Sequence, residues 1–186
     1  MNFHEKATIL DSREMVRAVR RVAHEVVEAN KGCENVVVVG VQRRGVTIAR
    51  RVVECIKEAE GVDVPLGTLD ITFYRDDLST LGPVPKVGKT DLSFDVNDKH
   101  IILVDDVLYT GRTVRAALDE LMDFGRPSSI QLAVLIDRGH RELPIRPDFV
   151  GKNVPTSAKE VVKVMVDEFD GREAVVVGEA GGEAKG

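Results

Sequence analysis

Hydrophobic residues follow two patterns along this chain. Apolar runs rich in β-branched residues, unbroken at residues 36–39 and 101–104 and interrupted only by Gln131 at residues 130–136, predict buried parallel strands. Apolar residues three and four positions apart predict helices at residues 12–30, from the loop 40–45 to about residue 60, and from about residue 110 through 118. Shorter β pieces are predicted at residues 69–74, 161–166 and 174–177. Alternating strands and helices predict an α/β fold with a mostly parallel central sheet flanked by helices.

Two polar segments interrupt this pattern. Residues 75–98 are rich in Gly and Pro and predict a mobile excursion or hairpin outside the core. Residues 179–186 are mostly Gly, Glu and Ala and predict a disordered tail. We therefore expect a single domain over residues 1–178.

Composition limits the class of protein. Hydrophobic residues make up 43% and charged residues 31% of the 186 positions, as in soluble globular proteins. Neither a membrane-spanning run nor a signal-peptide core is found, so we expect a cytoplasmic protein with no membrane partner. The net charge of −5 argues against indiscriminate nucleic-acid binding. Cys33 and Cys55 lack metal or redox spacing.

The richest chemistry follows the apolar run 101–104. Asp105 and Asp106 come at the carboxyl end of this strand, where open α/β sheets bind ligands. The segment Thr110-Gly111-Arg112-Thr113 then begins a helix, whose first N–H groups attract anions. Because paired carboxylates accept hydrogen bonds from diols, we expect a ligand with vicinal hydroxyls and a phosphate. Each piece alone also fits a solvated strand end and an ordinary helix cap.

A second loop ends the strand 36–39. Gly40 and Gly45 allow the backbone to approach an anion closely, and Arg43 and Arg44 add positive charge. In isolation, this loop is equally a basic turn that caps a helix.

The segment 101–113 resembles the phosphoribosyl-diphosphate (PRPP) signature of the type I phosphoribosyltransferases, since the acidic pair, Thr, Gly and Thr are in register. The resemblance implies that Asp105 and Asp106 hold the ribose hydroxyls. It also implies that the 5-phosphate is wrapped by Val107, Leu108, Tyr109, Thr110, Gly111, Arg112 and Thr113. The loop with Gly40, Arg43, Arg44 and Gly45 would take the diphosphate, with Arg43 where members usually carry threonine. The fold of the family adds a small hood, expected from about residue 138, and a flexible lid hairpin at about 75–98.

Residues 70–78 resemble the entry to that lid. Phosphoribosyl transfer passes through a transition state with oxocarbenium character, so a lid that excludes water is useful. Arg75 could then act on the departing diphosphate, and we count it as catalytic with Asp105 and Asp106. Lys86 and Lys89 are weaker candidates.

Residues 135–157 resemble one branch of this family, bifunctional proteins that combine uracil phosphoribosyltransferase activity with regulation of pyrimidine genes. The implied reaction converts uracil and PRPP into UMP and diphosphate. Mg²⁺ would bind mainly through substrate oxygens and possibly through Asp105 and Asp106. Arg138 and the backbone near Val162 would face the uracil ring.

The same resemblance implies a second function, binding of a pyrimidine-operon mRNA leader hairpin under control of UMP or UTP. Basic residues recur on one face of the first helix and in a later cluster: Arg17, Arg20, Arg21 and His24, then Arg141, Arg146 and Lys152. Without the resemblance, such stripes are usually solvated surfaces. Two alternatives stay open: a 6-oxopurine phosphoribosyltransferase, and an RNA-binding regulator with vestigial catalysis. A homodimer or homotetramer is expected by resemblance.

Overall fold

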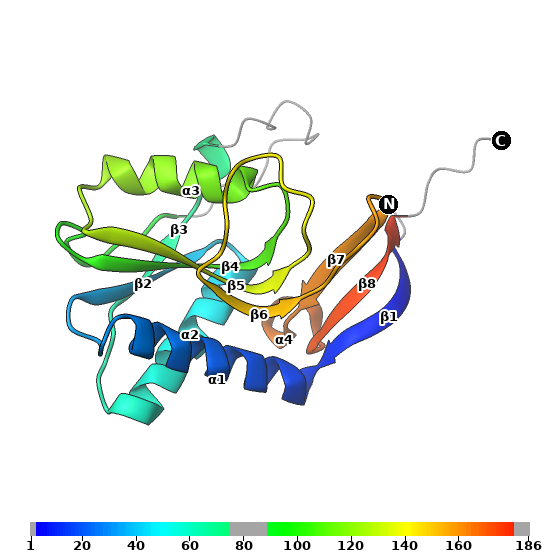
Figure 1. The fold of residues 1–186 in the computed structure, drawn as a ribbon, viewed down its shortest axis with the longest axis horizontal. Helices are drawn as coiled ribbons and strands as arrows, with labels where there is room; N and C mark the ends of the chain where they lie inside the picture. The colour runs from blue at the N-terminus through cyan, green and yellow to red at the C-terminus, as the bar shows by residue number, and fades with distance from the viewer. Residues whose placement is uncertain (1–2, 75–88, 181–186) are drawn as a thin grey trace.

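The computed structural model describes residues 3–74 and 89–180. Its main sheet has five parallel strands in the order β3-β2-β4-β5-β6 (Figure 1). The strands are β2 (Val36–Val41), β3 (Leu66–Leu69), β4 (His100–Leu108), β5 (Ser129–Asp137) and β6 (Phe149–Asn153). The predicted mostly parallel sheet is therefore confirmed, with β4 at its centre.

Helices cover both faces of this sheet. α1 (Ser12–Ala29) and α2 (Arg44–Glu60) lie on one face, and α3 (Arg112–Asp123) lies on the other (Figure 1). Strand β2 shows the consequence, because Val36 and Val38 belong to the core under α1 and α2, whereas Val37 belongs to the core under α3. Two covered faces explain why the strand lacks polar alternation.

The first helix begins and ends close to its predicted limits. Asp11 and Glu14 form a capping box, in which the Asp11 carboxylate accepts from the Glu14 N–H at 2.8 Å and the Glu14 carboxylate accepts from the Asp11 N–H at 2.9 Å. At the other end, the side chain of Asn30 donates to the Val26 carbonyl. Local sequence signals are thus sufficient to define this helix.

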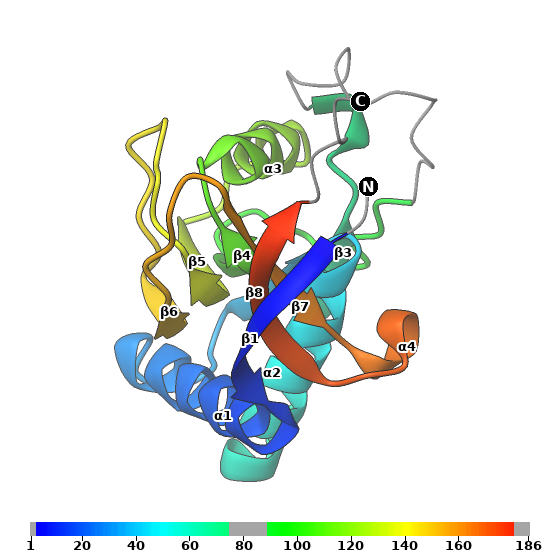
Figure 2. The same cartoon turned by 90° about the vertical axis from the view of Figure 1, so that its right-hand side faces the viewer.

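A second, antiparallel sheet has the order β1-β8-β7, formed by β1 (Phe3–Asp11), β7 (Glu160–Met165) and β8 (Ala174–Ala180). The single turn α4 (Asp167–Asp170) connects β7 to β8 (Figure 2). We call β1, β7, β8 and α4 the hood. The hood lies beyond the carboxyl ends of the strands of the main sheet (Figure 1). The hood predicted from residue 138 onward needs correction, because β6 belongs to the main sheet and β1, from the other end of the chain, belongs to the hood.

The strand predicted at residues 69–74 is wrong. β3 ends at Leu69, and Thr72–Tyr74 form the short 3₁₀ helix η1. The Asp70 carboxylate accepts a hydrogen bond from the Thr72 N–H at 3.0 Å, which turns the chain out of the sheet.

The predicted lid is too long. Residues 75–88 lie outside the described residues, but residues 89–98 pack on the core. Asp91 bridges Thr68 of β3, and Val96 is 2% exposed. Leu92 and Phe94 occupy the space above Gly67, where a Cβ would lie only 2.5 Å from Leu92 Cδ2. Because Gly67 has no side chain, Leu92 and Phe94 can pack against the core, although the segment that carries them is mostly polar.

The predicted tail also begins too early. β8 continues through Ala180, and the Glu179 carboxylate pairs with the Lys6 ammonium of β1 at 2.6 Å. Residues 181–186 lie outside the described residues. Within the part of the chain that the structure describes, no helix has the length and apolar character needed to cross a membrane.

Candidate active site at the carboxyl end of the parallel sheet

Strand β4 carries the acidic pair at the centre of the site. Its neighbours β2 and β5 hold it on both sides, and Asp105 is only 6% exposed. The Asp105 carboxylate accepts from the Asp106 N–H at 2.9 Å, and the Asp106 carboxylate accepts from the Val107 N–H at 2.8 Å. The two carboxylates are thus oriented by the backbone of the strand that carries them.

Burial raises the pKa of the Asp106 carboxyl. Its neighbour Asp105, the Val107 N–H and the Arg44 guanidinium act in the opposite direction. A carboxylate that has lost much of its hydration gains from any new partner, whether a hydroxyl or a cation. This environment suits the binding of a polyhydroxylated ligand.

A cavity of about 230 Å³ lies on one side of the pair, lined by Asp105, residues 107–114 and Glu142. The chain that lines this cavity turns at Gly111, whose φ of +93° favours glycine, and α3 begins at the next residue. The Thr110 hydroxyl accepts from the Arg112 N–H at 3.3 Å, and the Arg112 guanidinium pairs with Glu142 at 2.7 Å. Backbone N–H groups, hydroxyls and an arginine at a helix start are groups that can bind a phosphate, as predicted for this segment.

A second cavity of about 350 Å³ lies on the other side of the pair. It is lined by Arg44, Asp106, Asp170 and residues 162–165 of β7. Asp105 therefore borders one cavity and Asp106 the other. The acidic pair stands between the predicted phosphate cradle and the hood.

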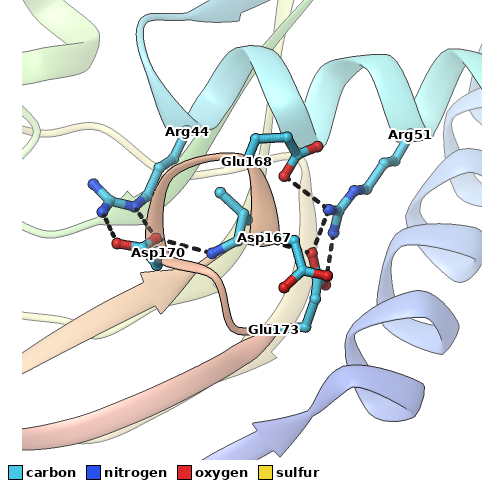
Figure 3. Close-up of polar contacts among 7 residues, drawn as sticks. Arg44, Arg51, Asp167, Glu168, Asp170 and Glu173 are labelled. Atoms are coloured by element: carbon cyan, nitrogen blue, oxygen red, sulfur yellow. Dashed lines mark hydrogen bonds and ion pairs between the residues drawn. The ribbon is translucent and has the colours of Figure 1, made fainter.

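The glycine-arginine loop joins β2 to α2 beside this second cavity. A Cβ on Gly45 would lie 2.8 Å from the Val104 carbonyl oxygen and 3.1 Å from Asp105 Cα, so only glycine allows α2 to begin this close to β4. The Gln42–Arg43 peptide bond is cis. The Arg43 guanidinium lies 5.6 Å from the centroid of the Phe169 ring, whereas Arg44 makes a bidentate contact with Asp170 (Figure 3). The structure thus brings Gly45 close to Asp105 and Arg44 to the cavity that Asp106 borders, and both arginines contact α4.

Arg138 extends from the end of β5 toward β7. It is 6% exposed, its Cζ lies 3.9 Å above the Tyr109 ring, and its Nη2 donates to the Glu160 carbonyl at 2.7 Å. Backbone groups two residues apart point the same way along a strand, so the N–H and C=O of Val162 point toward the same edge of β7, which pairs with no other strand among the described residues. The two predicted base-binding residues therefore meet at one strand edge.

The predicted RNA-binding residues differ in their surroundings. Arg17, Arg20 and His24 are exposed on α1, and Arg146 and Lys152 are exposed elsewhere. Arg21 is exposed as well, but its guanidinium donates to the carbonyls of Val150 and Gly151 in β6.

Arg141 is directed into its own loop, where it pairs with Asp137 at 2.5 Å and donates to the Tyr109 carbonyl at 2.9 Å. Both Arg21 and Arg141 hold segments of the fold together. RNA contact by any of these residues stays a prediction.

Three further residues were predicted in the lid. Arg75 and Lys86 lie outside the described residues, while the Lys89 carbonyl accepts from the Gln42 side chain at 2.8 Å. Sequence reasoning missed Glu142 and Asp170, which pair with the arginines of the two cavities. The run Asp167–Asp170 contains three acids, but nothing local to it indicates that it faces α2.

Comparison with known proteins agrees with this arrangement. The family model described as Phosphoribosyl transferase domain matches residues 6–169. The solved hypoxanthine-guanine phosphoribosyltransferase of Bacillus anthracis has a TM-score of 0.70 at 18% identity, covering 95% of this chain and 99% of that one. That of Trypanosoma cruzi, a hypoxanthine phosphoribosyl transferase, has a TM-score of 0.73 at 19% identity, covering 96% and 93%. These likenesses show the fold, and the chain is a phosphoribosyltransferase by fold and by family.

Curated relatives define the branch of that class. The Bifunctional protein PyrR of Caldicellulosiruptor bescii is 63% identical over 169 residues, which are 91% of this chain and 93% of that protein. The protein of the same name from Thermus thermophilus is 59% identical over 177 residues, covering 95% and 98%. The chain belongs to the PyrR family.

Proposed function

We propose that this protein transfers the phosphoribosyl group of PRPP to uracil, which yields UMP and diphosphate. The observation that carries the proposal is the position of the acidic pair, with Asp105 bordering the 230 Å³ cavity and Asp106 the 350 Å³ cavity. A ribose held by this pair can extend its 5-phosphate into the first cavity and its C1 substituents toward the second. The PyrR relatives support the choice of this activity over others of the same fold.

Each part of the substrate has a matching set of groups. The ribose hydroxyls donate to Asp105 and Asp106, and the 5-phosphate accepts from residues 107–113, which line the first cavity. The diphosphate lies against the loop of Gly40, Arg43, Arg44 and Gly45. Uracil presents acceptor, donor and acceptor along one edge, which backbone groups of β7 near Val162 together with Arg138 can read.

The chemistry asks little covalent work of the protein. The bond from C1 of the ribose to the diphosphate oxygen breaks, the bond from C1 to uracil N1 forms, and the N1 proton is lost. Positive charge develops on the ribose ring, and the Asp106 carboxylate would stabilise it. We assign no side-chain nucleophile, because positioning and neutralisation of the leaving group lower the barrier.

Mg²⁺ fits this donor set. It binds through one or two carboxylates together with substrate phosphate oxygens and water, and Asp105 and Asp106 supply such carboxylates beside both cavities. When bound, the ion would neutralise charge on the diphosphate.

We propose regulation of pyrimidine genes as the second function, through binding of a leader hairpin in mRNA controlled by UMP or UTP. The exposed basic residues Arg17, Arg20 and His24 lie together on α1 and can contact phosphates of a hairpin. We further propose a cytoplasmic homodimer or homotetramer, which sedimentation equilibrium would test.

The first experiment measures UMP formation from labelled uracil and PRPP with Mg²⁺, with hypoxanthine, guanine and orotate as competing bases. Turnover of uracil alone is the expected result. Turnover of hypoxanthine or guanine would instead indicate a 6-oxopurine enzyme. A protein that binds PRPP and a leader hairpin but turns over no base would be a regulator with vestigial catalysis.

A further inference from the structure

The turn α4 and Glu173, three residues beyond it, contact α2 through two sets of ion pairs (Figure 3). Near the start of α2, the Arg44 Nη2 lies 2.6 Å from Asp170 Oδ1 and its Nε lies 3.2 Å from Asp170 Oδ2. Seven residues further along, the Arg51 guanidinium pairs with Glu173 at 2.5 Å and with Glu168 at 3.4 Å. Seven residues are about two turns, so both arginines use the same side of the helix.

The two contacts face different spaces. Arg44 and Asp170 border the 350 Å³ cavity together with Asp106. Arg51 and Glu173 border a separate groove of about 410 Å³ toward α1. One ion pair therefore belongs to the proposed substrate site, while the other offers a matched contact of similar geometry outside it.

Asp170 is itself fixed from the hood. Its Oδ2 accepts a hydrogen bond from the Val166 N–H, directly after β7, at 3.0 Å, and its side chain is 17% exposed. The Arg44 guanidinium holds the pKa of the Asp170 carboxyl below its usual value, so the pair is ionised at neutral pH. A bidentate contact sets the plane of a guanidinium as well as its position.

We propose that Asp170 is a positioning residue, which holds Arg44 in the orientation that binds the diphosphate of the substrate. The contact uses Nε and Nη2 of Arg44, so Nη1 is the nitrogen that a bound diphosphate would meet. Because Asp170 is fixed to the end of β7, it also connects the diphosphate loop to the strand that carries Val162. This inference rests on the proposed function for the identity of the substrate.

The experiment compares Asp170→Asn with Glu173→Gln. Asparagine keeps an oxygen for the Val166 N–H but loses the charge that orients Arg44. We expect the KM for PRPP to rise about tenfold, with the KM for uracil changed less than about twofold. Glu173→Gln removes charge from the contact that faces the other groove, so we expect an unchanged KM for PRPP. Melting temperatures of the two variants show whether their structural costs are comparable.

A double-mutant cycle tests whether Asp170 acts through Arg44. In an Arg44→Gln background, Asp170→Asn should change the KM for PRPP less than about twofold, because the residue that it orients is gone. An additive effect would overturn the proposal. A lower KM in Asp170→Asn would also overturn it, since simple repulsion between a carboxylate and the diphosphate predicts that sign. Asp170→Glu, which keeps the charge on a longer side chain, should restore part of the affinity and serves if the asparagine variant does not fold.

Direct binding separates this inference from the proposed function. Inorganic diphosphate with Mg²⁺, titrated by calorimetry, should bind about tenfold more weakly to Asp170→Asn than to the wild type, with Glu173→Gln unchanged. If the wild-type protein formed no UMP but this difference held, the uracil reaction would fail and the role of Asp170 would stand. Equal diphosphate affinity in all three proteins would overturn the role of Asp170 alone.

Discussion

Asp105 and Asp106 are neighbours in sequence, yet the strand directs them to different surroundings. Successive side chains of a strand point to opposite faces, so Asp105 borders the cavity at the start of α3 and Asp106 borders the cavity between Arg44 and the hood. The sequence predicts the pair, and the strand separates its members into two neighbouring roles. In the proposed reaction, this division would let a single dipeptide contact a ribose between its two charged substituents.

Catalysis should depend on both carboxylates. We expect the double variant Asp105→Asn with Asp106→Asn to lose at least about a thousandfold in kcat/KM for UMP formation, because the ribose loses its charged acceptors. Circular dichroism should show an unchanged fold. Turnover near that of the wild type would contradict the assignment of the ribose site.

The raised pKa of the Asp106 carboxyl should make the stability of the protein depend on pH. A carboxyl whose pKa is raised in the folded state destabilises that state once it is ionised, and this cost disappears as the pH falls through the raised pKa. We therefore expect Asp106→Asn to raise Tm by about 2–4 °C at pH 7, with an advantage that shrinks toward pH 4. Thermal melts from pH 4 to pH 7 would measure the difference in Tm between the variant and the wild type. A difference that is smaller at pH 7 than at pH 4 would contradict the prediction.

Among the elements, α2 begins where two backbones nearly touch. The close approach of Gly45 to Val104 and Asp105 sets the loop before α2 against the carboxyl end of β4. Periodicity predicted this helix, and the two glycines of its loop were interpreted as allowing the backbone to approach an anion closely. Only the structure showed that the partner of Gly45 is the strand that carries the acidic pair.

The substitution Gly45→Ala should push the start of α2 away from the carboxyl end of β4. Alanine is favoured over glycine in a helix by up to about 1 kcal/mol, so a net loss of stability would mean that the clash with the Val104 carbonyl dominates. We expect a fall in Tm of about 3–6 °C and at least a tenfold loss in kcat/KM. Arg50→Ala, an exposed change in the same helix, is the control and should leave both values unchanged. Unchanged activity in Gly45→Ala would show that this close approach is unnecessary.

Arg17 and His24 on the outer face of α1 should contribute to RNA binding. Arg17→Ala with His24→Ala should weaken binding to a pyrimidine leader hairpin several-fold. Each phosphate that is no longer neutralised should flatten the salt dependence of binding by about 0.7–0.9 in log-log slope. The melting temperature should not change, because both residues are exposed. Binding that is equally strong at every salt concentration would exclude this face from the interface.

Arg21→Ala tests the other kind of arginine on α1. It removes the donor to the carbonyls of β6, so we expect a lower Tm by several degrees. Loss of RNA affinity in that variant alone would not assign an RNA-binding role to Arg21, which is why Arg17 and His24 are the informative pair.

At the scale of the whole molecule, the hood joins the two ends of the chain. β8 lies between β1 and β7, with Leu10 opposite Val175 and Val164 opposite the same residue. Val175 and Val176 are fully buried. The hood therefore forms only when the last strand is present.

Shortening the chain tests this dependence. A protein ending at Ala180 keeps every pair of β8, so we expect wild-type Tm and UMP formation. A protein ending at Glu173 lacks β8 and leaves β1 and β7 without a partner, so we expect it to be insoluble or to melt at least about 10 °C lower. Similar melting of the two proteins would contradict the structural role of β8.

The sequence by itself determined the parallel core, the first helix, and the acidic pair followed by a Thr-Gly turn at the start of a helix, because each depends on periodicity or on residues a few positions apart. It misplaced β3, where the Asp70 side chain turned the chain earlier than the alternating pattern indicated. It also missed the strand β1, which is mostly exposed, and the packing of residues 89–98 over Gly67.

Tertiary structure alone decided which distant segments meet. The pairing of β1 with β8, the contact of Asp170 with Arg44 and the inward direction of Arg141 join residues through geometry that no local pattern records. A charged side chain in an exposed turn has the same sequence signature whether it meets solvent or a partner across the fold. Its partner is chosen by how the packed sheets and helices bring backbones together, because burial and chain topology act over the whole molecule.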